Sequence, residues 1–219
     1  WLLPRVHASP RRRLGWWLRT VGKRLFPSGV YLGDGRVLTR IIFGETMVVD
    51  GRDLSIAPAL IGHGVWEPDV TSVVLQRARP GMRALDIGAN FGYYTLLLCR
   101  AVGDMGQVLA FEPQARLYTF LAHNIELNGY GGIATPYRLA LGDNPGSRLL
   151  TRARTSLGAA SGSGSLREEV VREAWPAEGA GVLEQETVQV VRLDDLGLGR
   201  IDFAKIDAEG AELEIWRGG

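Results

Sequence analysis

The feature that most constrains this chain is a short apolar strand that runs through a glycine-rich turn straight into a helix. It spans residues 84–95, and the turn reads Gly88-Ala89-Asn90-Phe91-Gly92. Gly88 and Gly92 allow a sharp change of direction and the close approach of a ligand, because glycine has no Cβ. The free N–H groups and the dipole of the helix start favour a carboxylate or another anion. The sequence therefore predicts a ligand site at the end of this strand.

This turn departs from the fingerprint of dinucleotide-binding proteins. That pattern is G-x-G-x-x-G, whereas here Asn90 stands at the second glycine and Tyr93 at the last. Asp86 precedes the turn, where a carboxylate repels a pyrophosphate but suits the sulfonium-bearing amino acid part of S-adenosylmethionine. Glu112 ends the next apolar run, at about the spacing at which a carboxylate reaches a ribose diol. Together they favour a nucleotide-like ligand, with a nicotinamide-dependent oxidoreductase and a non-catalytic binding module as the alternatives.

Strands and helices alternate from residue 81 onward. We expect strands at residues 83–87, 107–111, 135–141 and 201–206, and helices at 93–102, at 114–128 and from about 211. Such alternation is typical of a mostly parallel sheet covered on both faces. The predicted fold class is therefore α/β, a Rossmann-like doubly wound sheet, with its ligand at the carboxyl ends of the strands.

The preceding part, residues 1–80, is predicted to hold a basic helix, a small hairpin and a lead-in helix. The hairpin strands are expected at 36–43 and 45–50, and the lead-in helix from about 68 to 78. The first 24 residues carry arginine and lysine but no acidic residue. We favour a helix docked on its own domain over weak contact with an anionic membrane surface, and we expect no nucleic-acid partner.

Residues 151–190 form an insertion between the third and fourth predicted strands. It contains the glycine- and serine-rich run 158–165, which we expect to be flexible. Long loops in compact domains are usually either functional or disordered. Two interpretations therefore stay open, a disordered surface insertion and a lid that covers a substrate.

Three ordered motifs resemble those of the FkbM methyltransferases. Residues 86–95 are similar to the cofactor-binding turn of that family, Phe111-Glu112-Pro113 to its ribose strand, and residues 193–196 and 201–212 to its closing signature. Residues 64–68, which contain Glu67, are similar to its approach segment. The resemblance implies S-adenosylmethionine as the methyl donor and a hydroxyl of a sugar or secondary metabolite as the acceptor, hence a small-molecule or glycan partner.

The resemblance and the residues together give a set of candidate site positions. The expected cofactor-binding residues are Glu67, Asp86, Gly88, Ala89, Asn90, Gly92, Glu112 and Asp143. Asp143 is expected either to accept a hydrogen bond from the adenine amino group or to form a turn with its neighbours. No cluster of histidine, cysteine and carboxylate residues has metal-ligand spacing, so we predict no metal.

Asp207 and Glu209 are the candidate catalytic residues. Both follow the fourth predicted strand, where a carboxylate can accept the proton of a hydroxyl or align it with the sulfonium. The alternative for Glu209 is an acidic residue that complements the dipole of the following helix.

Composition adds further expectations. The single cysteine, Cys99, cannot form an internal disulfide, which is consistent with a reducing, cytoplasmic setting. No apolar run reaches the roughly 18 residues of a membrane span. A complete methyltransferase of this architecture has about three more strands, so we expect the C-terminal strands to be missing from this chain. The sequence leaves the oligomeric state open.

Overall fold

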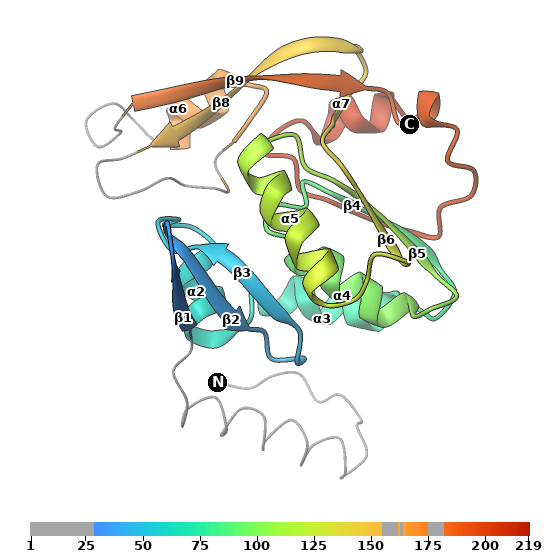
Figure 1. Ribbon diagram of the computed structural model, residues 1–219. Coiled ribbons are helices and arrows are strands. Elements are labelled where there is room, and N and C mark those ends of the chain that lie inside the picture. Colours follow the sequence, from blue (N-terminus) through green and yellow to red (C-terminus); the bar gives the residue numbers. More distant parts are fainter. Residues whose placement is uncertain (1–28, 155–161, 163, 175–181) are drawn as a thin grey trace.

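The computed structural model describes residues 29–154, 162, 164–174 and 182–219. The described strands form three sheets, a four-stranded central sheet and two three-stranded sheets (Figure 1). The basic helix predicted within the first residues lies outside the described part of the chain. Among the described residues, no helix has both the length and the apolar character that crossing a membrane requires.

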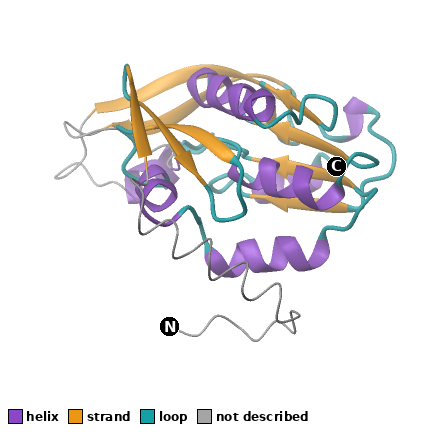
Figure 2. Ribbon diagram, turned by 60° about the horizontal axis from the view of Figure 1, so that its bottom comes forward, coloured by secondary structure: helices purple, strands orange, loops and turns teal. Residues whose placement is uncertain are grey.

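The central sheet has the order β10-β4-β5-β6, and its strands are all parallel. These strands are β4 (Arg83–Ile87), β5 (Gln107–Phe111), β6 (Ala134–Tyr137) and β10 (Phe203–Ile206). Alternate residues of β4 and β5 enter two cores. One core contains α4 (Tyr93–Val102) and α5 (Ala115–Leu127), and the other contains α7 (Glu212–Arg217). Helices thus pack along the strands, as Figure 2 shows, and the predicted α/β sheet is confirmed.

The third strand is shorter than predicted. The sequence suggested one strand over 135–141, but β6 ends at Tyr137 and β7 (Ala140–Leu141) belongs to another sheet. The reason lies in β5, whose ladder with β6 closes where the Glu112 amide donates to the carbonyl of Tyr137 at 3.0 Å. The next residue, Pro113, has no N–H to continue the pairing.

The N-terminal part of the described chain is a three-stranded antiparallel sheet with two helices. Its elements are β1 (Gly29–Gly33), β2 (Arg36–Arg40), β3 (Thr46–Asp50), α2 (Ala57–His63) and α3 (Pro68–Arg77). β2, β3 and α3 lie within the ranges predicted for the hairpin and the lead-in helix, whereas β1 and α2 were not predicted. β1 is flanked by glycine and largely exposed, and α2 has only 7 residues, so neither carries a clear hydrophobic period.

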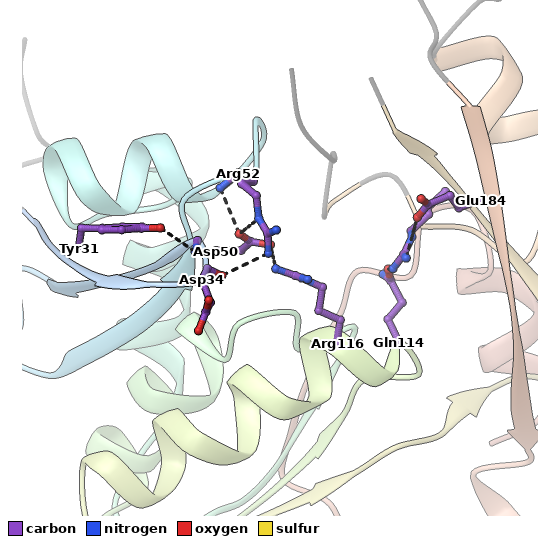
Figure 3. Close-up of polar contacts among 9 residues, drawn as sticks. Tyr31, Asp34, Asp50, Arg52, Gln114, Arg116 and Glu184 are labelled. Atoms are coloured by element: carbon purple, nitrogen blue, oxygen red, sulfur yellow. Dashed lines mark hydrogen bonds and ion pairs between the residues drawn. The ribbon is translucent and has the colours of Figure 1, made fainter. Parts of the chain in front are cut away.

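Polar contacts fasten this N-terminal sheet to α5. Asn124 of α5 is fully buried, and its side chain accepts from the Val48 amide at 2.7 Å and donates to the Val48 carbonyl at 2.9 Å. Asp50 of β3 pairs with Arg116 of α5 and with Arg52 (Figure 3). The first residues after β3 are thereby held close to the carboxyl end of β5.

The described part of residues 151–190 holds more regular structure than the sequence suggested. β8 (Gly146–Arg154) pairs antiparallel with β9 (Val182–Val191) along the whole of β8, and α6 (Glu168–Ala174) lies between them in the chain. Arg152 and Arg154 form ion pairs with Glu184 across the ladder. The glycine- and serine-rich run lies in the middle of the insertion, whereas the strands lie at its two flanks. Most of the glycine- and serine-rich run lies outside the described residues.

Candidate functional site

A cavity of about 330 Å³ opens at the carboxyl ends of β4, β5 and β10. It lies within the range of roughly 300–1,000 Å³ that is typical of small-molecule pockets. The sequence-predicted residues in its wall are Glu67, Gly88, Ala89, Asn90, Glu112, Asp207 and Glu209. The fold thus brings seven of the ten candidates, from four segments of the chain, to one place.

The turn after β4 is built by left-handed backbone. Gly88 has φ +76 and Gly92 has φ +91, and the amides of Gly88 and Ala89 both donate to the carbonyl of Phe111, at 3.0 and 2.9 Å. A Cβ on Gly88 would lie 1.9 Å from the carbonyl oxygen of Asp207. The close approach of the residue after β10 is therefore the main reason why position 88 requires glycine. The sequence did not reveal this reason.

We expect Gly88→Ala to lower the free energy of unfolding by at least about 3 kcal/mol, because backbone strain and overlap with a fixed carbonyl add together. Gly129→Ala is a matched control, since Gly129 has φ +72 and nothing within 4 Å of its added Cβ. It should cost only about 1–2 kcal/mol. Urea unfolding of both variants measures the difference, and equal losses would show that the overlap relaxes freely.

Glu112 follows β5 and is buried. Its Oε2 accepts from the Asn90 amide at 2.8 Å, and its Oε1 accepts from the Gln114 amide at 2.9 Å. Burial raises the pKa of Glu112 to about 7, against the lowering effect of these two hydrogen bonds. One carboxylate thus joins the glycine turn to the start of α5 while it lines the cavity.

Asp86 lies beneath the cavity and not in its wall. It is fully buried in β4, and its Oδ2 accepts from the Thr95 hydroxyl at 2.6 Å. Its Oδ1 has no hydrogen-bond partner, and the ammonium of Lys205 lies 3.9 Å away. Burial raises the pKa of Asp86, and Lys205 opposes that shift. Asp86 was expected to contact the ligand directly, but its side chain lies behind the turn instead.

Lys205 of β10 and Tyr94 of α4 line the same cavity and were missed in the sequence. The Lys205 ammonium donates to Asp207 Oδ2 at 3.2 Å and lies 4.8 Å from the centre of the Tyr94 ring. The Tyr94 hydroxyl donates to Glu67 Oε2 at 2.9 Å. The sequence held one indication of these contacts, because Lys205 is a charged residue inside a short strand that was predicted to be buried in the sheet.

Glu209 lies in the turn between β10 and α7. The residue as a whole is exposed, but partial desolvation of its carboxyl, with Asp207 and Glu212 nearby, raises its pKa to about 7. The alternative for Glu209 was an acid at the start of the following helix, but Glu212 has that place, accepting from the amides of Ala208 at 2.9 Å and Gly210 at 3.2 Å. Glu209 is left to face the cavity.

Backbone strain is concentrated at this cavity. Among the described residues, the non-glycine residues with positive φ are Asp34 (53), Glu67 (40), Asn90 (52) and Glu209 (49). Three of these four line the cavity. Such conformations cost energy and cluster at functional sites, so the strain marks Glu67 and Glu209 independently of their charge.

The insertion also reaches this cavity. Leu166, and Val170 and Val171 of α6, are in its wall, next to Leu150 of β8, which directly precedes the insertion. Ser165 holds them there, because its hydroxyl donates to the Glu209 carbonyl at 2.6 Å. These contacts place the described residues around Ser165 and α6 at the cavity wall.

Asp143 is not in the cavity wall. Its Oδ1 accepts from the Asn144 side chain at 2.7 Å, an arrangement that suits a turn former. The neighbouring stretch of wall is apolar instead, formed by Leu139, Ala140 and Leu141. In the described part of the chain, no group of three or more histidine, cysteine or acidic residues is placed to hold a metal ion.

The cavity is strongly acidic. Glu67, Glu112, Asp207 and Glu209 line it, Asp86 lies beneath it, and Lys205 is the basic residue among the described lining side chains. A site with this excess of carboxylates attracts a cation and repels a polyphosphate.

Comparison with known proteins agrees with this geometry. Residues 86–219 match the family described as methyltransferase FkbM domain. The chain is 31% identical over 153 residues to methyltransferase sdnD of Sordaria araneosa, covering 61% of this chain and 59% of that protein. It is 29% identical over 143 residues to methyltransferase 1 of Beauveria bassiana, covering 61% of this chain and 57% of that protein. The matched region thus spans less than two thirds of either relative.

Among solved structures, TYW2 of P. horikoshii in complex with MeSAdo is similar at 17% identity, covering 61% of this chain and 50% of that one. The TM-score of 0.41 is too low to support an argument about function.

Proposed function

Because residues 86–219, more than half of its length, match the FkbM domain, this chain belongs to the FkbM methyltransferase family, and we propose that it transfers a methyl group from S-adenosylmethionine to a hydroxyl of a small-molecule or glycan acceptor. The observation that carries the proposal is the acidic cavity at the carboxyl ends of β4, β5 and β10. A cationic sulfonium suits this charge, and a dinucleotide pyrophosphate does not.

The residues in the wall fit the parts of S-adenosylmethionine. Each oxygen of Glu112 accepts one backbone N–H, which leaves further lone pairs for the two ribose hydroxyls. The apolar stretch Leu139, Ala140 and Leu141 suits a purine ring. The turn that begins at Gly88 would hold the amino acid part, with the carboxylates around it facing the positive charges.

The donor supplies an electrophilic methyl group, so the protein has to align the acceptor hydroxyl and take its proton. Glu209 is suited to take the proton, because a general base works best when its pKa lies near the working pH, and its own pKa is about 7. Asp207 stands beside it, held by Lys205 at 3.2 Å, and is suited to orient the hydroxyl. We propose that the proton passes to Glu209.

Calorimetric titration with S-adenosylmethionine and with NAD tests the proposed donor site. We expect saturable binding of S-adenosylmethionine and no heat with NAD, because the glycine pattern is broken and the wall is acidic. Binding of NAD without S-adenosylmethionine would favour an oxidoreductase and overturn the proposal. A screen of sugar, polyketide and peptide hydroxyls with a tritiated methyl donor follows, and donor binding without any transfer would favour a non-catalytic binding module.

A further inference from the structure

Lys205 is a basic residue on the wall of an otherwise acidic cavity, next to the place where the proposed donor would carry its own positive charge. Its side chain is 9% exposed. β10 pairs with β4 in a register that puts Lys205 directly beside Asp86. A cation here is unfavourable for the direct binding of a sulfonium, so its presence calls for a role toward the protein's own groups.

The contacts of Lys205 join three parts of the site. Its ammonium donates to the Gly88 carbonyl at 3.5 Å, in the turn after β4. It donates to Asp207 Oδ2 at 3.2 Å, in the turn after β10, and it lies over the ring of Tyr94. Lys205 therefore ties the turn that carries Asp207 and Glu209 to the glycine turn that would hold the donor.

We propose that Lys205 is a positioning residue, which holds the turn that carries Asp207 and Glu209 against the glycine turn. This inference rests on the proposed function, since it assigns a purpose to the geometry of that same site. Lys205 contacts Asp207 and Asp86 and not Glu209, so it acts through the position of the turn and through its charge. Without its charge, Glu209 loses a nearby cation and takes up a proton at higher pH.

The titration of Glu209 is the readout for this role, because a purely structural side chain would not move it. The charged groups around Glu209 are Asp207 in its own turn, Glu212 of α7, Glu67 before α3 and Lys205 of β10. Arg167 lies close by as well, donating to the Gly210 carbonyl at 3.5 Å. Among the groups that act directly on Glu209, Lys205 lowers its pKa.

The experiment follows the ¹³C NMR signal of the Glu209 carboxyl as a function of pH in the full chain. Lys205→Met alone would leave Asp86 buried without a counter-ion, so the test variant is Lys205→Met combined with Asp86→Asn. Lys205→Gln, also combined with Asp86→Asn, is a second uncharged variant that keeps a donor for Asp207, and Asp86→Asn alone is the reference for both. We expect both to move the midpoint of Glu209 upward by about half a pH unit, as expected for the loss of a nearby positive charge.

Two controls separate charge from folding. Lys205→Arg keeps the positive charge and should restore the midpoint of the parent protein. Arg100→Met removes another ion pair with a buried carboxylate, that of Glu45, at the far end of α4, and should leave the midpoint unchanged. An unchanged midpoint in both uncharged variants overturns the proposal for Lys205. Calorimetry of the parent chain is independent of it, because failure to bind S-adenosylmethionine would overturn the proposed function alone.

Discussion

Replacing Glu112 with glutamine is expected to weaken the binding of S-adenosylmethionine about 10- to 100-fold, since a charged acceptor for two hydroxyls is lost. The same change should alter the way in which stability depends on pH. Glu112 is buried, and burial raises its pKa from the ordinary value of 4.5 to about 7. Calorimetry of donor binding and urea unfolding across pH 5 to 8 measure the two effects.

The direction of the stability effect follows from the raised pKa. A carboxyl whose pKa is higher in the folded than in the unfolded protein contributes its stability fully below the unfolded pKa and loses it as pH rises through the folded pKa. Between about pH 4.5 and 7 this loss amounts to roughly 3 kcal/mol for Glu112. Glutamine does not ionise, so the variant should not lose this stability as pH rises. Its free energy of unfolding relative to that of the parent should therefore increase by about the same amount over this interval, although one backbone N–H loses its acceptor.

Glu186→Gln is the control for this prediction. Glu186 also accepts a backbone N–H at the start of α5, that of Ala115 at 3.0 Å, but it does not line the cavity. Its replacement should leave donor affinity unchanged. If Glu112→Gln bound the donor as tightly as the parent does, Glu112 would serve only to join the glycine turn to α5.

The central sheet and its glycine turn could be predicted because their signals are local. Residues 83–87 and 107–111 are apolar runs bounded by turn residues, and the structure has strands over the same bounds. Strand ends in a parallel sheet meet at one edge, so Glu112 and Asp207 could be expected to lie near each other. These steps need only short-range patterns and a general rule of topology.

The remaining features depend on partners distant in the chain. Nothing near Lys205 in the sequence shows that its register partner is Asp86, because that pairing spans the whole insertion. β8 and β9 were missed for the same reason, since each is stabilised by the other. Asp143 was predicted from its place after a strand, and the residues Leu139, Ala140 and Leu141 before it do line the cavity, but its own carboxylate pairs with Asn144 outside the wall.

Replacing Glu209 with glutamine is expected to lower turnover about 100- to 10,000-fold, the range typical for loss of a general base. Donor affinity should change only slightly, because glutamine keeps the shape of the side chain and Glu112 is untouched. The measurement is transfer of a tritiated methyl group to an acceptor identified in the hydroxyl screen, alongside calorimetry. Asp207→Asn is the comparison, and it should retain more turnover, since an orienting role survives in part.

The pH profile gives this assignment a second signature. Glu209 must be ionised to accept a proton, so kcat/KM of the parent should rise as pH passes about 7 and level off above it. Because the pKa is raised, this rise in kcat/KM should occur well above the pH at which an ordinary glutamate titrates. In Glu209→Gln this rise should be absent, and the residual kcat/KM should not change across the same pH interval.

Glu209→Gly separates loss of chemistry from loss of structure. Glu209 has φ +49, which glycine adopts without strain, so this variant should be about 1 kcal/mol more stable than the parent. It should nevertheless be as inactive as Glu209→Gln, because the proton acceptor is gone. A stabilised and inactive variant would identify the strained backbone as the means by which the carboxylate is held in the cavity. Turnover close to that of the parent would instead remove Glu209 from the mechanism and make Asp207 the candidate proton acceptor.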